Sequence, residues 1–132
     1  YTLSLHDALP IYVDVAADSP IKGYSNLMYT FHFYAATHKE MYREKVKAAV
    51  KKGLPVFVSE FGISESSGNG SIDKKEANTW IQFLKKNKIS YVCWSLSNKD
   101  ESCSLLKSSS TRTGNFRKTD LSAAGRWYQA VK

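Results

Sequence analysis

Three short runs of the chain contain no Asp, Glu, Lys or Arg, and they constrain the fold more than any other feature. The runs span residues 27–34, 54–59 and 89–96 and are rich in aromatic and β-branched side chains. Apolar residues follow one another in these runs instead of alternating with polar ones. Continuous apolar strands are typical of parallel sheets that are covered on both faces. We therefore predict three buried, parallel strands.

Helical patterns follow the first two runs. Thr37 with Glu40 three residues later is a capping-box signature that predicts a helix start, and Gly53 supplies the stop. Asp73 with Glu76 marks the start of a second helix in the same way. The expected inward-facing residues are Tyr42, Val46, Ala49 and Val50 in the first helix and Ala77, Trp80, Ile81 and Leu84 in the second.

A polar loop over residues 97–120 follows the third run and leads to a last helix. Ser122 is the expected N-cap, and the apolar side carries Ala124, Trp127, Tyr128 and Val131. Strands alternating with helices predict an α/β fold with a parallel sheet. This order fits a Rossmann-like sheet or part of a (β/α)₈ barrel. No Gly-x-Gly-x-x-Gly follows a predicted strand, so a dinucleotide-binding site has no support.

Composition limits the classes that need to be considered. The 132 residues are enough for one packed domain, and no apolar run reaches the length of about 18 residues that a membrane-spanning helix needs. The net charge of +7 suggests nucleic-acid binding. However, the lysines cluster in two amphipathic helical segments, which is typical of solvated helix faces. Cys93 and Cys103 are too few for a disulfide framework or a four-ligand zinc site, and we expect free thiols.

Polar or aromatic side chains close the predicted strands, where α/β enzymes carry their working residues. His32 and Tyr34 end the first strand, Glu60 follows the second, and Trp94 lies in the third. The histidine and the tryptophan each have a structural alternative, as a hydrogen-bonded core residue and as barrel packing. Glu60 is harder to explain structurally, because a carboxylate between apolar residues is costly to desolvate unless it is paired. A carboxylate beside a tryptophan platform suits carbohydrate chemistry.

Residues 13–132 resemble the C-terminal portion of bacterial family 5 endoglucanases. The resemblance is carried by NLMYTFHFYAATH at 26–38, GLPVFVSEFG at 53–62 and WSLSNKDE at 94–101. It implies a partial (β/α)₈ barrel, consisting of roughly the last three βα units with strands six to eight. It also implies a retaining endo-β-1,4-glucanase that acts on cellulose or a related β-glucan. We expect no metal or cofactor, no nucleic-acid or membrane partner, a monomeric parent protein and an extracellular location.

The resemblance also implies residue roles. Glu60 would be the catalytic nucleophile, Tyr34 would hydrogen-bond that carboxylate, and His32 would line the subsite of the cleaved sugar. Trp94 would stack on that sugar. Further substrate contacts would come from Lys99, Glu101, His38 and Ser66.

Two departures from the family pattern affect what this chain can do. The family's acid/base is a Glu in an Asn-Glu-Pro motif, and the 132 residues contain no such tripeptide. Retaining glycosidases need two carboxyl groups about 5–5.5 Å apart, so we expect this fragment to be inactive alone. Residues 1–11 do not match the family and are similar to translated sequencing-adapter sequence. We therefore treat 1–11 as non-native, exclude His6 and Asp7 from any site, and assign 12–132 to the catalytic barrel.

An alternative function from another class is a non-catalytic carbohydrate-binding module that uses Trp94, Tyr34 and Lys99 as a platform. Such modules are usually β-sandwiches with alternating strands, which the continuous strands disfavour. A nucleic-acid-binding domain is a third possibility, and its binding would depend strongly on salt.

Overall fold

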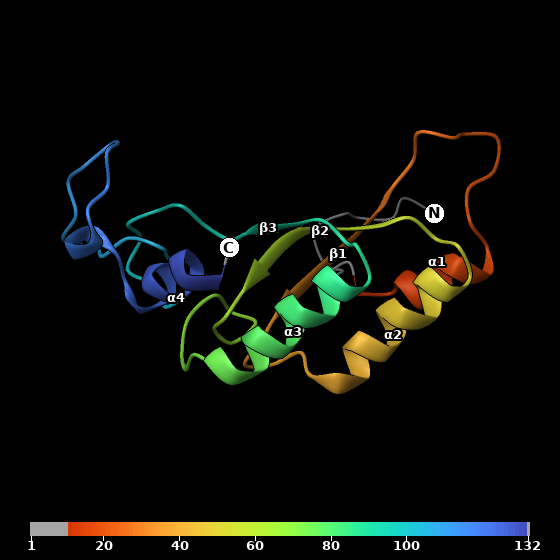
Figure 1. The fold of residues 1–132 in the computed structure, drawn as a ribbon, viewed down its shortest axis with the longest axis horizontal. Coiled ribbons are helices and arrows are strands. Elements are labelled where there is room, and N and C mark those ends of the chain that lie inside the picture. Colours follow the sequence, from red (N-terminus) through yellow and green to blue (C-terminus); the bar gives the residue numbers. More distant parts are fainter. Residues whose placement is uncertain (1–10, 132) are drawn as a thin grey trace.

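The computed structural model describes residues 11–131. The elements follow one another as α1 (Val13–Asp18), β1 (Tyr29–Tyr34), α2 (Glu40–Lys51), β2 (Val56–Gly62), α3 (Lys74–Lys86), β3 (Tyr91–Cys93), a short 3₁₀ helix (Lys118–Asp120) and α4 (Ala123–Val131) (Figure 1). Within these residues no helix is both long enough and apolar enough to cross a membrane. Residues 1–10, which hold most of the segment predicted to be non-native, lie outside the described part.

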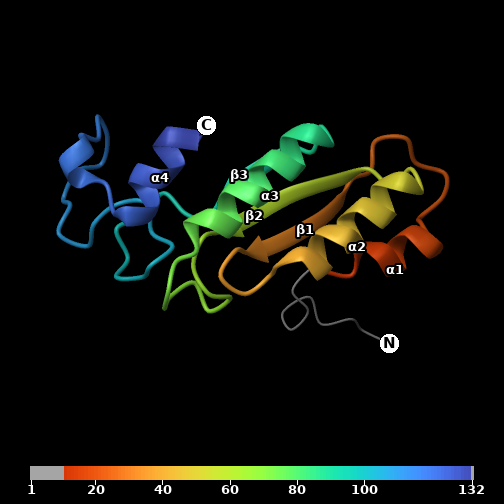
Figure 2. The same ribbon diagram turned by 60° about the horizontal axis from the view of Figure 1, so that its bottom comes forward.

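The strands form one parallel sheet in the order β1-β2-β3. Helices α2 and α3 run alongside the strands, and α1 lies beside α2 (Figures 1 and 2). Helix α4 and the loop before it lie at the end toward which the strand arrows point (Figure 1). The α/β class and the three parallel strands are therefore confirmed. The numbering of the strands as six to eight of a barrel stays a prediction.

The core lies between the sheet and the helices. Phe33 stacks on Trp80 of α3 with 4.0 Å between ring centroids, and on Phe61 of β2 at 5.2 Å. We call this side the helix-covered face, and its most buried strand residues are Phe31, Phe33, Val58 and Phe61. The opposite side, the open face, carries Thr30, which is exposed, and three partly exposed residues, His32, Ser59 and Glu60.

Two of the three predicted helix caps are present. Asp73 accepts a hydrogen bond from the backbone N–H of Glu76 at 2.9 Å, and Ser122 Oγ accepts one from the N–H of Gly125 at 3.0 Å. All four residues predicted to face inward from α3 are buried, namely Ala77, Trp80, Ile81 and Leu84. In α2, Val46 and Ala49 are buried, whereas Tyr42 and Val50 pack against the core partly exposed.

The capping box predicted for α2 is wrong. The helix begins at Glu40 after Lys39, which provides no side-chain cap. Thr37 Oγ1 instead accepts from the backbone N–H of Ser66, 2.9 Å away in the loop after β2. A tertiary contact has therefore taken the side chain that the local pattern assigned to the helix. The predicted stop is present, because Gly53 has φ +85°, a conformation that favours glycine.

The strands differ in extent from the predicted runs. The first begins at Tyr29 instead of 27, the second is displaced toward its C-terminus as Val56–Gly62, and the third shortens from 89–96 to Tyr91–Cys93. After β3 the chain folds back on itself, with the N–H of Leu105 donating to the carbonyl of Ser95 at 3.0 Å. Helix α1 and the 3₁₀ helix were not predicted.

Candidate active site

An irregularity in β2 determines which side chains reach the open face. Thr30 pairs with Phe57 and His32 with Glu60, so two steps along β1 correspond to three along β2. The pairing of β2 with β3 is shifted at the same place. Such a β-bulge adds one residue and changes the direction of the side chains that follow. Val58 and Phe61 consequently both lie in the core, although they are three residues apart.

Glu60 is held by two side chains of β1. The hydroxyl of Tyr34 donates to Oε1 at 2.7 Å, and His32 Nδ1 lies 3.7 Å from Oε2. The side chains of His32 and Glu60 are 20% and 22% exposed, so the carboxylate is fixed in position and still reachable from solvent. A Cβ at position 62 would lie 2.7 Å from the ring of Tyr34, so Gly62 leaves the space that this ring occupies.

The neighbours of Glu60 are electrically neutral. Burial, and then the hydrogen bond to Glu60, raise the pKa of Tyr34 well above its usual value, so the phenol keeps its proton. Burial lowers the pKa of His32 more than the charge of Glu60 raises it, which favours the neutral imidazole. The site therefore holds one carboxylate between a phenol and an imidazole.

Trp94 stands at the end of β3, beside the strand that carries Glu60. Its backbone N–H donates to the carbonyl of Phe61 at 2.7 Å, and its residue surface is 47% exposed. Val92 and Leu96, two residues before and after it, are exposed as well. An indole exposed at the edge of the site can accept the apolar face of a ring-shaped ligand.

Lys99 and Glu101 form an ion pair in the loop after β3, with 2.5 Å between Lys99 Nζ and Glu101 Oε1. Lys99 is 71% exposed, whereas Glu101 is 22% exposed and its Oε2 lies 3.9 Å from Cys103 Sγ. The charge of Glu101 is close enough to contribute to the raised pKa of Tyr34. Cys103, which Glu101 contacts, lies beside the end of β2, because its Cβ would be 3.5 Å from a Cβ at position 62.

Hydrogen bonds join the loop after β2 to the loop after β3. Asn69 Oδ1 accepts from the N–H of Ser102 at 3.2 Å and from its hydroxyl at 2.9 Å. The N–H of Cys103 donates to the carbonyl of Gly68 at 3.0 Å. We call this set the loop tie. It fixes the segment that carries Glu101 against the end of β2.

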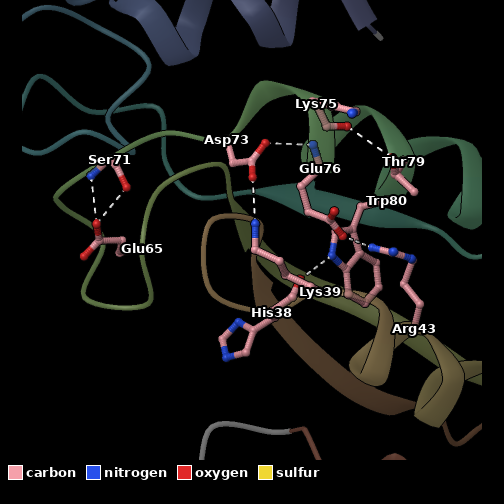
Figure 3. Close-up of polar contacts among 10 residues, drawn as sticks. All are labelled: His38, Lys39, Arg43, Glu65, Ser71, Asp73, Lys75, Glu76, Thr79 and Trp80. Atoms are coloured by element: carbon pink, nitrogen blue, oxygen red, sulfur yellow. Dashed lines mark hydrogen bonds and ion pairs between the residues drawn. The ribbon is translucent and has the colours of Figure 1, made fainter.

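His38 and Ser66 are not part of the cluster around Glu60. His38 is buried, and its Nδ1 accepts from the backbone N–H of Tyr34 at 2.8 Å. Its carbonyl accepts from Trp80 Nε1 at 2.7 Å, and Lys39, the next residue, pairs with Asp73 (Figure 3). These contacts stabilise the turn between β1 and α2. Ser66 is exposed in the loop after β2, and sugar contacts by either residue stay predictions.

Both cysteines are free thiols. Burial raises the pKa of Cys93 to about 12 and also raises the pKa of Cys103, so both keep their protons near neutral pH. Within residues 11–131 no three His, Cys, Asp or Glu side chains gather where a metal ion could be shared.

Sequence reasoning missed Ser59 and Thr30, which lie on the open face beside His32. It also missed Asn69 and Ser102 of the loop tie. One sequence signal for the bulge exists, namely the spacing of three between Val58 and Phe61 in an apolar run. The loop tie joins residues 33 positions apart, for which the sequence has no local signal.

The fold and this cluster are those of an α/β enzyme, with polar groups gathered at the carboxyl ends of parallel strands. Residues 11–100 match the family model described as cellulase (glycosyl hydrolase family 5). The chain belongs to this family. It is 44% identical over 113 residues to an endoglucanase of Clostridium saccharobutylicum and 37% identical over 116 residues to endoglucanase A of Butyrivibrio fibrisolvens. These alignments cover 86% and 87% of this chain.

Solved structures agree with the family assignment. A protein from Cytophaga hutchinsonii superposes with a TM-score of 0.86 at 36% identity, covering 90% of this chain and 39% of that chain. The catalytic domain of a Thermobifida fusca endoglucanase, solved in complex with cellotetraose, has a TM-score of 0.78 at 31% identity over 88% of this chain and 38% of that chain. This chain spans only 25% and 27% of the two endoglucanases named above.

Proposed function

We propose that the chain is the nucleophile-bearing part of a retaining endo-β-1,4-glucanase and that Glu60 is the nucleophile. The observation that carries this proposal is the placement of Glu60 at the carboxyl end of a parallel strand. There Tyr34 donates to its Oε1 at 2.7 Å, and His32 lies 3.7 Å from its Oε2. Membership of the cellulase family supplies the reaction class.

In this mechanism an oxygen of the Glu60 carboxylate attacks the anomeric carbon. The bond to the leaving glucan oxygen breaks, and that oxygen takes a proton from a general acid. Water, deprotonated by the same acid/base group, then attacks the anomeric carbon and releases Glu60. Because Tyr34 occupies Oε1 at 2.7 Å, we expect Oε2 to form the covalent bond.

The proposed substrate is a β-glucan such as cellulose. Trp94, 47% exposed at the end of β3, offers an aromatic surface for the sugar at the cleavage point. The ion-paired Lys99 and Glu101 offer a donor and an acceptor for hydroxyl groups further along the cleft. The Thermobifida fusca relative was solved with cellotetraose, a β-glucan fragment.

The acid/base group would come from a part of the protein that these 132 residues do not contain, since they hold no Asn-Glu-Pro. We infer that β1, β2 and β3 are the sixth to eighth strands of a (β/α)₈ barrel, which in full has about 250 residues. Within the described sheet β1 and β3 each pair on one side only. Free strand edges promote association with other chains, and closure of the barrel removes them. We further propose that the complete enzyme is monomeric and acts outside the cell, where cellulose is found.

A chimera tests the role of Glu60. Residues 12–132 of this chain would replace the matching segment of the Clostridium saccharobutylicum endoglucanase, which is 44% identical over the aligned 113 residues. Glu60→Gln keeps the shape of the side chain and removes the attacking charge, so turnover on carboxymethylcellulose should fall by about 10³-fold or more. The matched control is Glu65→Gln, an exposed carboxylate in the following loop that bonds only within that loop, to Ser71.

Two further measurements address the mechanism. A 2-fluoro-cellobioside with a good leaving group should label the peptide that contains Glu60, and proton NMR should detect the β-anomer as the first product. Near-normal turnover of Glu60→Gln would refute the assignment. The 132-residue chain alone should hydrolyse no β-glucan, and hydrolysis by it would contradict the absence of the acid/base group.

A further inference from the structure

The bulge in β2 lets two consecutive residues of one strand contact the same imidazole. Ser59 Oγ lies 2.8 Å from His32 Nε2, and Glu60 Oε2 lies 3.7 Å from His32 Nδ1. In a regular strand consecutive side chains point to opposite faces. The bulge is therefore what places both Ser59 and Glu60 on the open face. Thr30 of β1 completes the group, because its hydroxyl is hydrogen-bonded to that of Ser59.

The position of Glu60 determines which nitrogen of His32 carries the proton. A neutral imidazole has one N–H donor and one nitrogen acceptor. A lone pair on Nδ1 would face the Glu60 carboxylate and repel it, so the proton belongs on Nδ1. Nε2 must then accept, and Ser59 donates its only hydroxyl proton to it. The oxygen of Ser59 is left to accept the proton of Thr30.

We propose that Ser59 is a positioning residue that holds His32 in its neutral Nδ1–H tautomer, with that N–H directed at the nucleophile, and that Thr30 orients Ser59. The donors run in one direction, from Thr30 to Ser59 to His32 to Glu60. The inference rests on the proposed function, in which Glu60 is the nucleophile. Ser59 acts through His32 and does not itself touch the reacting atoms.

The direction of the donors predicts a pH effect. The hydrogen bond from Ser59 stabilises the imidazole only while Nε2 has no proton. Removing it favours uptake of a proton by His32, so the pKa of His32 rises. Glu60 on β2 is the charged group that acts on His32, and Tyr34 on β1 binds the other oxygen of Glu60. Burial acts against protonation of His32 in the intact site.

The test compares Ser59→Ala with Ser59→Thr in the chimera. In Ser59→Ala the acidic limb of the kcat/KM profile should move up by about half to one pH unit. The activity below the limb should accordingly drop by about 3- to 10-fold, with recovery at higher pH. Ser59→Thr keeps the hydroxyl and should keep the limb. Thr30→Val removes only the donor to Ser59 and should give a smaller shift in the same direction, which also covers the case that Ser59→Ala does not fold.

A second readout does not depend on activity. Long-range ¹H–¹⁵N correlations of the imidazoles, assigned with His32→Gln, should identify His32 as the Nδ1–H tautomer, and in Ser59→Ala the Nε2–H form should gain population. An Nε2–H tautomer in the unsubstituted protein, or an unchanged acidic limb in both Ser59→Ala and Thr30→Val, would overturn the inference. If Glu60→Gln stays active, the proposed function fails instead, whatever the tautomer.

Discussion

The two faces of the three-stranded sheet are built from the same strands and differ in nearly every property. On the helix-covered face, Phe31, Phe33 and Phe61 are fully buried; the first two meet Trp80 of α3, and Phe61 stacks on Phe33. On the open face, His32 and Glu60 keep about a fifth of their side-chain surface exposed, at 20% and 22%. Neighbouring residues of β1 therefore serve opposite purposes, since Phe31 and Phe33 flank His32 in the sequence.

This difference shows how one sheet can be rigid and chemically active at once. Aromatic packing on the helix-covered face fixes the backbone of β1 and β2. The backbone in turn fixes the relative positions of Tyr34, His32 and Glu60, which come from two strands. A change on the helix-covered face should consequently affect stability, and a change on the open face should affect catalysis. This separation of stabilising from catalytic residues can be tested in the chimera.

The largest effect is expected for Trp80→Ala on the helix-covered face. Trp80 is fully buried, stacks on Phe33 with centroids 4.0 Å apart and donates to the carbonyl of His38. Its removal should lower the free energy of unfolding by about 3–5 kcal/mol, measured by urea denaturation. The kcat per folded molecule should change little. Phe83→Ala, which removes a half-buried ring from the same helix, should cost less. An equal loss of stability in both variants would contradict the prediction that burial of the ring determines the loss.

Tyr34→Phe should have the opposite signature. The variant keeps the buried ring and removes the hydroxyl that donates to Glu60 at 2.7 Å. Hydrogen bonds to charged groups contribute about 1.5–3 kcal/mol, so kcat should fall about 10- to 150-fold. The free energy of unfolding should fall by no more than about 1.5–3 kcal/mol, which is less than in Trp80→Ala. Tyr128→Phe on α4 is the matched control and should leave kcat unaltered. A large stability loss with normal kcat would assign Tyr34 to packing instead.

Trp94→Ala should affect substrate binding rather than folding. The residue is 47% exposed, so nearly half of its surface makes no contact that stabilises the fold. Loss of a stacking surface should raise KM for cello-oligosaccharides about tenfold, which corresponds to about 1.4 kcal/mol. Leu96→Ala, an exposed apolar residue two positions later, is the control. Small and equal changes in both variants would favour the packing explanation of Trp94.

The sequence was sufficient to predict which side of α3 packs against the sheet. Periodicity identified Ala77, Trp80, Ile81 and Leu84 as inward-facing because local spacing alone determines which side of a helix is apolar. On the open face the residue types Glu60, Tyr34 and His32 were found, since polar groups that end apolar runs are conspicuous. Their mutual geometry was not predictable, because it depends on a bulge that the alternation of a strand does not encode.

Hydrogen bonds from polar side chains to backbone groups were also beyond the sequence. The capping box at Thr37 failed because its hydroxyl bonds to Ser66, 29 positions away. The sequence also did not predict that His38 Nδ1 accepts from the backbone N–H of Tyr34, four residues earlier; its assignment to the cleft by resemblance stays a prediction. In both cases a polar side chain satisfies a backbone N–H group that would otherwise lack a partner, and such demands appear only after the loops are placed.

The smallest effect is expected for Asn69→Ala in the loop tie, which lies outside both faces. The variant removes the acceptor for the N–H and hydroxyl of Ser102, whereas the bond from Cys103 to the carbonyl of Gly68 is retained. The one hydroxyl proton of Ser102 can still be donated to the carbonyl of Gly70, 2.6 Å away. Asn69→Ala should therefore destabilise the loop tie by about 1 kcal/mol.

That loosening should reach the substrate through Glu101, the residue before Ser102. We expect KM for long cello-oligosaccharides to rise about 2- to 5-fold, within the same 1 kcal/mol. The kcat should stay constant, because the hydrogen bonds that Asn69→Ala removes go to Ser102 and not to Glu60 or Tyr34. Substrates too short to reach the Lys99–Glu101 pair should show no change in KM. Ser67→Ala removes a hydroxyl from the same loop that bonds only to Asn69 and serves as the control. A drop in kcat that is equal for short and long substrates would mean that the loop tie supports the nucleophile itself, and the separation between binding and catalytic residues would then have to be redrawn.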